Sequence, residues 1–236
     1  MESKINDIDM KRWKDYEEIR TTDLWLIPKR GETVSGGDSK FRGNFIPLIP
    51  YTMILRYTKE GETVLDPTSG SGTTCDVANF LKRKCYAYDI NPSRDDIMYG
   101  NVLHSTYPQS NLVIFHPPYH NVIKYSTSAD DLSNCRDIEV FLDRMKTALR
   151  NLDNYLSEGR YFVLVLGRIY SGGQVWDLGS RCASWLQDSG YELRGVIAKD
   201  FPFRRRQWQL ERYRALKNGY WQFKYDSIYV LRKKGS

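Results

Sequence analysis

The stretch from Thr63 to Thr74 reads TVLDPTSGSGTT. Thr63 to Leu65 is a short apolar run of the kind that forms strands, and the glycines and small residues after Asp66 are typical of a turn. From Thr73 to Leu81 the apolar residues recur at helical spacing. This order predicts a strand that passes through a glycine-rich loop into a helix.

Strand and helix signals alternate along the rest of the chain. We expect a mainly parallel sheet, because helical segments between the strands can carry the chain back across it. A last apolar run, Ser227 to Leu231, is expected to add an edge or antiparallel strand. The other predicted strands are Cys85 to Asp89, Leu112 to Phe115, Arg160 to Leu166 and Tyr191 to Ala198, and the other predicted helices are Ile138 to Leu156 and Trp176 to Gln187.

The composition limits the number of domains and the location. A chain of 236 residues, of which 41% are hydrophobic, can bury one sizeable core, and without repeats or long linkers residues 1–236 are expected to form a single domain. No segment approaches the roughly 18 apolar residues that cross a bilayer, and the N-terminus is charged where a signal peptide is apolar. We therefore expect a cytoplasmic protein that contacts no membrane. The cysteines are widely spaced and lack a CxxC pair, which predicts reduced thiols and no metal site.

The glycine loop favours one kind of ligand. Small residues let a ligand approach the backbone, and the start of the helix provides unpaired N–H donors. A phosphate-binding P-loop would have lysine where Thr73 stands, and a dinucleotide loop would have a third glycine that is absent here. The loop therefore suits a cationic, amphipathic cofactor with an acid nearby; the alternative is an ordinary strand-to-helix turn.

Two further strand ends carry candidate site residues. Asp89, in the sequence YDINP, can accept hydrogen bonds from ribose hydroxyls or can simply cap a turn. The strand ending at Phe115 runs into HPPY at residues 116–119, where two prolines stiffen the backbone and the tyrosine offers an aromatic face. This loop is a candidate clamp for a planar amine, or else a turn with a packed tyrosine. Ligands bind at the carboxyl ends of parallel strands, so Asp66, Asp89 and His116 should face one site.

Together, LDPTSGSGTT, YDINP and HPPY resemble the amino-methyltransferases of DNA, which modify cytosine N4 or adenine N6. That family has a DPF-GSGTT cofactor loop and a D/N/S-PPY/F catalytic loop. The segment FRGNFIP, from Phe41 to Pro47, also looks like a cofactor-contacting segment of the family. The resemblance implies an α/β, Rossmann-like methyltransferase fold with a mainly parallel sheet and a late antiparallel strand, S-adenosylmethionine as cofactor, and DNA as substrate.

The resemblance also implies roles for individual residues. The glycine loop would contact the methionine part of the cofactor, Asp89 would hold its ribose, and Tyr119 would stack on a flipped base. The implied cofactor-binding residues are Asn44, Phe45, Asp66, Pro67, Thr68, Gly70, Gly72, Thr73, Asp89, Ile90 and Asn101, and the implied catalytic residues are His116, Pro117, Pro118 and Tyr119.

Two positions depart from the family pattern. His116 stands where the family has Asp, Asn or Ser, and Asn101 lies in the stretch where a further acid commonly touches the adenine of the cofactor. No Pro-Cys nucleophile stands in the catalytic position, which disfavours methylation of cytosine carbon 5. The sequence separates the two amino targets only weakly, and the lack of a carboxylate or amide at position 116 favours cytosine N4.

The expected chemistry depends on acceptors that orient the amine. The Pro117 carbonyl and the His116 side chain or carbonyl would accept its two N–H bonds and aim the lone pair at the methyl group. Only a neutral imidazole can accept a hydrogen bond. Activity is therefore expected to fall below the ordinary histidine pKa of about 6.5.

The distribution of positive charge indicates the partner. The net charge of +6 weakly favours a polyanion, and from Phe201 onward basic residues alternate with aromatic ones, as in nucleic-acid-binding surfaces or in an amphipathic helix with solvated charges. A homodimer or a partner subunit remains open, and the alternative functions are methylation of RNA or of a protein amide, or a catalytically idle nucleic-acid-binding subunit. We expect double-stranded DNA to contact segments 120–136 and 201–224, mainly through Lys124, Arg136, Arg204, Arg205, Arg206, Arg212 and Arg214.

Overall fold

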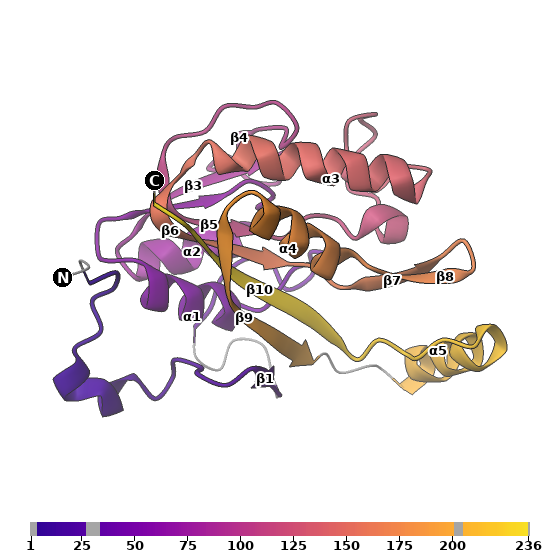
Figure 1. Cartoon of the computed structure of the whole chain (residues 1–236), viewed down its shortest axis with the longest axis horizontal. Helices are drawn as coiled ribbons and strands as arrows, with labels where there is room; N and C mark the ends of the chain where they lie inside the picture. The colour runs from indigo at the N-terminus through magenta and orange to yellow at the C-terminus, as the bar shows by residue number, and fades with distance from the viewer. Residues whose placement is uncertain (1–3, 27–33, 201–204, 236) are drawn as a thin grey trace.

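A computed structural model describes residues 4–26, 34–200 and 205–235 (Figure 1). The strands are β1 (Leu24–Trp25), β2 (Thr63–Asp66), β3 (Lys84–Asp89), β4 (Met98–Tyr99), β5 (Ser110–Phe115), β6 (Leu156–Val165), β7 (Arg168–Ser171), β8 (Gln174–Asp177), β9 (Tyr191–Asp200) and β10 (Tyr225–Lys233). The α-helices are α1 (Leu48–Tyr57), α2 (Thr73–Phe80), α3 (Ile138–Asp153), α4 (Leu178–Asp188) and α5 (Arg205–Asn218), and the 3-10 helices are η1 (Met10–Tyr16), η2 (His120–Val122) and η3 (Leu132–Asn134). Within the described ranges, no helix has both the length and the apolar character needed to span a lipid bilayer.

Eight strands form one sheet in the order β1-β9-β10-β6-β5-β2-β3-β4. All neighbouring pairs are parallel except those of β10, which runs antiparallel to both β6 and β9. The predicted fold class is therefore confirmed, including the late antiparallel strand. The apolar run from Ser227 to Leu231 forms the middle of β10, and it lies inside the sheet rather than at its edge.

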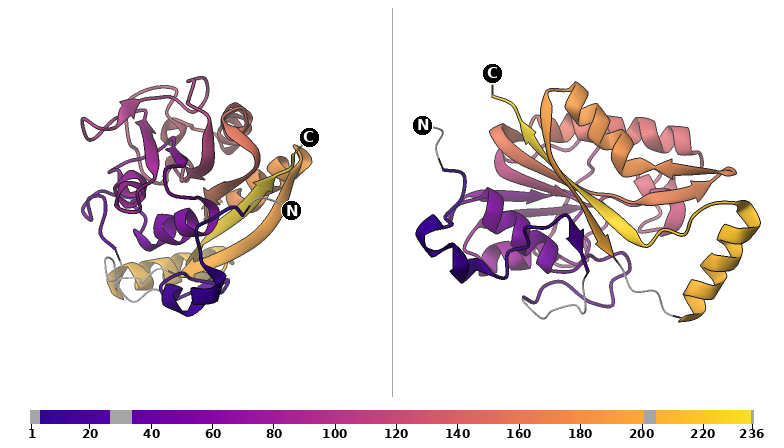
Figure 2. Two further views of the ribbon diagram at one scale, coloured as in Figure 1. Left: turned by 90° about the vertical axis from the view of Figure 1, so that its left-hand side faces the viewer. Right: turned by 60° about the horizontal axis from the view of Figure 1, so that its bottom comes forward.

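The two faces of the sheet bury different apolar side chains. In β5, Val113 and Phe115 belong to the core formed with α3 and α4, whereas Leu112 and Ile114 belong to the core formed with α1 and α2. The two pairs of helices accordingly lie on opposite faces of the sheet (Figures 1 and 2). Successive side chains of a strand point to opposite faces, so burial on both faces explains the continuous apolar run in this strand.

Two differences from the sequence prediction move residues from a predicted helix into a strand. The helix α3 ends at Asp153 and β6 begins at Leu156 rather than Arg160, because Leu156 pairs with Ser110 of β5. Trp176 lies in β8 rather than in a helix and pairs with Ile169 of β7. These two strands form a hairpin that turns at residues 172–173, which are glycines with positive φ and form a recognisable two-residue hairpin turn.

The hairpin β7–β8 and the helix α5 project from one end of the molecule (Figure 1). The hairpin follows the carboxyl end of β6, and α5 follows the carboxyl end of β9. β6 is parallel to β5, and β5 to β2, while β9 runs in the same direction as β6 because β10 is antiparallel to both. Both projections therefore extend from the side of the sheet at which the carboxyl ends of β2, β3 and β5 lie.

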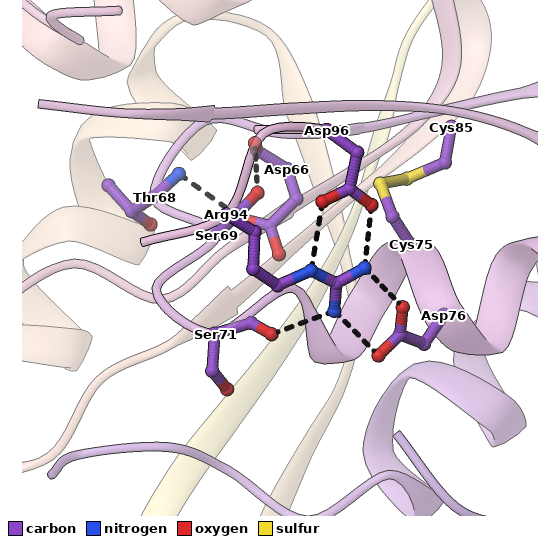
Figure 3. Close-up of a disulfide and its surroundings, with 9 residues drawn as sticks. All are labelled: Asp66, Thr68, Ser69, Ser71, Cys75, Asp76, Cys85, Arg94 and Asp96. Atoms are coloured by element: carbon purple, nitrogen blue, oxygen red, sulfur yellow. Dashed lines mark hydrogen bonds and ion pairs between the residues drawn. A yellow bond between two sulfur atoms is a disulfide. The ribbon is translucent and has the colours of Figure 1, made fainter. Parts of the chain in front are cut away.

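A disulfide joins Cys75 near the start of α2 to Cys85 in β3 (Figure 3). The prediction that all cysteines are reduced thiols is wrong for this pair, whereas Cys135 and Cys182 are free and buried. The crossover from β2 through α2 to β3 packs the helix on the strand and places the two Cα atoms 5.2 Å apart. The spacing in sequence does not reveal this contact, which depends on the tertiary fold.

Loss of the disulfide is expected to lower the free energy of unfolding by about 2–3 kcal/mol, because the closed loop restricts the unfolded chain. Chemical unfolding of Cys75→Ala/Cys85→Ala against the wild type measures this difference. Thiol titration of the denatured, unreduced wild type provides the control: only Cys135 and Cys182 should react, and reaction of all the cysteines would contradict the assignment.

Candidate functional site

The loop after β2 requires glycine at two positions. Gly70 and Gly72 have φ values of 54° and 82°, in the left-handed region that glycine adopts most easily. A Cβ atom on Gly70 would lie 2.9 Å from the Phe41 ring, and one on Gly72 would lie 2.6 Å from the Arg94 guanidinium. Backbone conformation and close packing therefore both require glycine at these positions. The helix α2 begins directly after Gly72.

Asn44 connects this loop to the segment that precedes α1. Its side-chain amide donates a hydrogen bond to the Ser71 hydroxyl at 2.8 Å, and its side-chain oxygen accepts one from the Thr73 hydroxyl at 2.6 Å. The neighbouring Phe45 is buried. Asn44 thus holds the loop in shape as well as lying beside it, a role that the sequence did not indicate.

Arg94 holds the loop from the other side (Figure 3). Its guanidinium donates to both carboxylate oxygens of Asp76, at 2.9 and 2.8 Å, and to the backbone carbonyl of Ser71 at 3.1 Å. It also pairs with Asp96, and Asp76 accepts the backbone N–H of Gly37 at 2.8 Å. This network joins α2, the glycine loop and the segment after β3. It was not predicted because Arg94, Asp76 and Asp96 lie in no motif.

Asp89 ends β3 beside the glycine loop. One of its carboxylate oxygens accepts the backbone N–H of Gly70 and the other accepts that of Asn91, each at 2.9 Å. Burial raises the pKa of Asp89, while these two N–H donors favour its ionised form. Each oxygen can accept a further hydrogen bond from a ligand hydroxyl.

Asp66 ends β2 and is buried, with 2% of its surface exposed. One carboxylate oxygen accepts the backbone N–H of Thr68 at 3.1 Å. Burial raises the pKa of Asp66 to about 7, and the nearby charge of Asp89 contributes to the rise. A cation bound above this carboxyl group would favour its ionised form and lower that pKa.

A cavity of about 330 Å³ is lined by both the glycine loop and the HPPY loop, a size in the ordinary range of small-molecule pockets. The Thr68 hydroxyl is buried at this cavity and has no hydrogen-bond partner among the described residues. Asp66, Gly72 and Thr73 do not line the cavity. The predicted residues that do line it are Asn44, Phe45, Pro67, Thr68, Gly70, Asp89, Ile90, Asn101, His116, Pro117, Pro118 and Tyr119.

His116 is held between two aromatic rings. Its ring centroid lies 5.0 Å from that of Phe45 and 5.6 Å from that of Tyr119, and no residue in the described ranges hydrogen-bonds the imidazole. Burial lowers the pKa of His116 to about 4. A pKa of about 4 moves the expected loss of activity from pH 6.5 to a lower pH, because desolvation favours the neutral imidazole.

Two charged residues from late in the chain also line the cavity. Lys199 in β9 and Asp226 in β10 are direct cross-strand partners, with the Lys199 Nζ atom 3.3 Å from an Asp226 carboxylate oxygen. Neither residue was predicted to belong to the site, because the predicted strands end at Ala198 and begin at Ser227, one position short of each residue. The sequence did contain one indication of this pair, since residues of opposite charge directly flank the two apolar strands.

The residues predicted to contact DNA differ in how they are placed. Lys124 and Arg136 are exposed after the HPPY loop, and Arg212 and Arg214 are exposed on α5. Close to α5, the Trp221 side chain is 91% exposed. Arg205 and Arg206 belong to α5, and Arg204 lies outside the described residues. DNA contact by these residues stays a prediction.

One family model matches the first part of the chain in sequence. A family model described as DNA methylase matches residues 2–99. The resemblance to the DNA amino-methyltransferases is confirmed. The matched segment includes the glycine loop and Asp89 and ends before the HPPY loop. No curated protein matches the chain in sequence.

Solved structures share the fold. TrmN from Thermus thermophilus is 18% identical with a TM-score of 0.52, and the alignment covers 81% of this chain but only 50% of TrmN. The 4+2 cyclase SpnF is 11% identical with a TM-score of 0.54, covering 86% of this chain and 89% of SpnF. A candidate DNA modification methylase, also from Thermus thermophilus, is 20% identical with a TM-score of 0.40, covering 58% of this chain and 53% of that one. The likeness to TrmN and SpnF, at these identities, concerns the fold alone, and one fold hosts more than one chemistry.

S-adenosylmethionine is the cofactor of the methyltransferases that this chain resembles, and the cavity suits it. Asp89 lines the cavity and offers acceptors for ribose hydroxyls. Asp66 ends the adjacent strand without lining the cavity, and a cation bound nearby would favour its ionised form. The unpartnered Thr68 hydroxyl can donate to a ligand oxygen, while Ile90 and Val102 provide apolar surface for a planar ring.

Affinity for S-adenosylmethionine is expected to rise about tenfold between pH 6 and pH 8, because Asp66 ionises through its pKa of about 7 and then attracts the positive cofactor. Titration calorimetry at both pH values measures the change. The side chain in Asp66→Asn cannot ionise, so this variant should bind the cofactor weakly at both pH values. Any pH dependence that remains in the variant comes from the amino group of the cofactor itself. Equal pH dependence in the wild type and the variant would contradict the prediction.

Arg94→Ala is expected to weaken cofactor binding by roughly tenfold, because it leaves Asp76 without its bidentate partner and releases the Ser71 carbonyl. The dissociation constant for S-adenosylmethionine is the measurement. Arg12→Ala, which breaks an exposed pair with Asp15, is the matched control and should have little effect. Unchanged affinity in Arg94→Ala would show that the loop keeps its shape without this network.

Proposed function

We propose that this protein is a DNA methyltransferase that transfers a methyl group to the exocyclic amino group of a flipped base, with cytosine N4 as the preferred target. The observation that carries the proposal is that the glycine loop and the HPPY loop line one cavity. A methyl donor and a planar amine bound there would meet. The match to the DNA methylase family over residues 2–99 favours the amino groups of DNA bases over those of RNA or protein as substrates.

The residues of the HPPY loop would orient the amine. S-adenosylmethionine supplies a methyl group attached to a positively charged sulfur. The lone pair of a base amine is delocalised into the ring, so the protein must draw it out of conjugation before transfer. The stiff Pro117-Pro118 backbone fixes the direction of the Pro117 carbonyl. This carbonyl would accept one N–H of the amine and so turn the lone pair of the amine toward the methyl group. The other N–H needs a second acceptor, which the family pattern provides at position 116.

Tyr119 is the proposed stacking partner of the base. Its ring packs edge-on against His116, and its hydroxyl is buried, so the ring is fixed in the cavity wall. A base inside a duplex cannot reach such a cavity, and a flipped base needs a surface that replaces its lost stacking.

The duplex would lie against α5 and the β7–β8 hairpin in this proposal. Both project from the edge of the sheet that carries the cavity (Figure 2). Arg212 and Arg214 can pair with phosphates, and the exposed Trp221 offers an aromatic face. The preference for cytosine N4 rests on position 116, where a neutral histidine replaces the carboxylate or amide usual for adenine.

Incubation of the protein with labelled S-adenosylmethionine and duplex DNA of mixed sequence is expected to produce N4-methylcytosine, detected by mass spectrometry of the digested nucleosides. Tyr119→Ala should lower the turnover rate by roughly 10- to 100-fold, the value of one base-stacking contact, while cofactor affinity stays unchanged. Equal loss of turnover and cofactor affinity would argue against the stacking role.

Other products would redirect the proposal. N6-methyladenine would keep the reaction and change the base. Cofactor binding without any DNA product would favour RNA or a protein amide as substrate if either is methylated, and an idle nucleic-acid-binding subunit if neither is.

A further inference from the structure

Lys199 and Asp226 form a charged pair in the wall of the cavity. They face each other in the antiparallel register of β9 and β10, and their side chains are only 11% and 22% exposed. Removing two charges from water costs several kcal/mol, and their mutual attraction does not always offset this cost. Apolar side chains at these two positions would stabilise the strand pair at least as well. A pair of this kind at a ligand cavity points to a role in ligand binding.

The Asp226 carboxylate lies at the catalytic loop. A Cβ atom built on Gly167 would lie 3.1 Å from the Asp226 Oδ1 atom and 3.0 Å from the Tyr119 ring, so the carboxylate and the ring meet at this glycine. The charges of Asp226 and Lys199 both act on His116. The cavity therefore places a carboxylate beside the loop whose first residue, in this chain, is neither an acid nor an amide.

We propose that Asp226 is the second acceptor for the target amine, in place of the side chain at position 116. The inference rests on the proposed function. One amine N–H would donate to the Pro117 carbonyl and the other to Asp226. The amine nitrogen forms its bond to the methyl carbon with its own lone pair, while the carbon–sulfur bond breaks and its electron pair stays on sulfur. The extra amine proton passes to the Asp226 carboxylate and then to water.

Lys199 completes a recognition pair for the base edge. Its ammonium donates hydrogen bonds, whereas the ring nitrogen next to the amine of cytosine or adenine only accepts them. An acceptor and a donor side by side match the amine and ring nitrogen of these two bases. Thymine presents the reverse order and guanine presents two donors, so the pair selects for the amino bases that can be methylated.

The test compares single-turnover methyl transfer in the wild type, Asp226→Asn and His116→Asp/Asp226→Asn. Asp226→Asn is expected to lower the rate by about a hundredfold, the usual loss of one oriented polar group, with cofactor affinity unchanged. The double variant restores a carboxylate at the family position and should regain at least about tenfold of that rate. Glu192→Gln, which removes a carboxylate from the far end of β9, serves as the control and should react like the wild type.

Several outcomes would overturn the inference. An Asp226→Asn rate within about twofold of the wild type would do so, as would an equal loss of rate and cofactor affinity, which would assign the pair a structural role. Absence of rescue in the double variant would show that Asp226 does not replace the residue at position 116. A wild type that methylates no DNA would overturn the proposed function, and this inference with it, whereas the other results overturn the inference alone.

Discussion

The parallel pairing of β2, β3 and β5 is the constraint on which the rest of the structure depends. Val64 of β2 pairs with Cys85 of β3 on one side and with Leu112 of β5 on the other. All three strands therefore end at one edge of the sheet, where the glycine loop, Asp89 and the HPPY loop follow. None of these segments could form a shared site alone, since they lie far apart in the sequence.

The glycine loop shows how a flexible sequence becomes a fixed surface. Glycine permits the turn but does not enforce it, because a glycine-rich segment loses more conformational entropy on folding than any other. The bonds that hold the loop come from outside: the Asp89 carboxylate accepts from Gly70, Asn44 bonds to Ser71 and Thr73, and Arg94 bonds to the Ser71 carbonyl. A preorganised loop of this kind binds a ligand without further ordering cost.

The sequence predicted what local patterns encode and missed what only the tertiary fold brings together. The strands, the main helices and the glycine loop follow from period, turn chemistry and motif, and most motif residues line one cavity. The Cys75–Cys85 disulfide and the Arg94 network join segments whose contact depends on helix packing. The lowered pKa of His116 could not be predicted, because the solvent exposure of a side chain is not visible in a sequence. Lys199 and Asp226 lie one residue beyond the predicted strands, at the positions where boundaries are least certain.

The position of β10 affects the order in which the cavity can form during synthesis. This strand follows every other strand in the sequence, yet it lies in the interior of the sheet between β6 and β9. Because it runs antiparallel, its first residues, rather than its last, reach the edge that carries the cavity. A nascent chain that has not yet reached Tyr225 already contains the glycine loop and the HPPY loop, but β9 then has only the two residues of β1 as a sheet neighbour. The cofactor side of the cavity can therefore assemble early in translation, and the wall formed by β9 and β10 is added last.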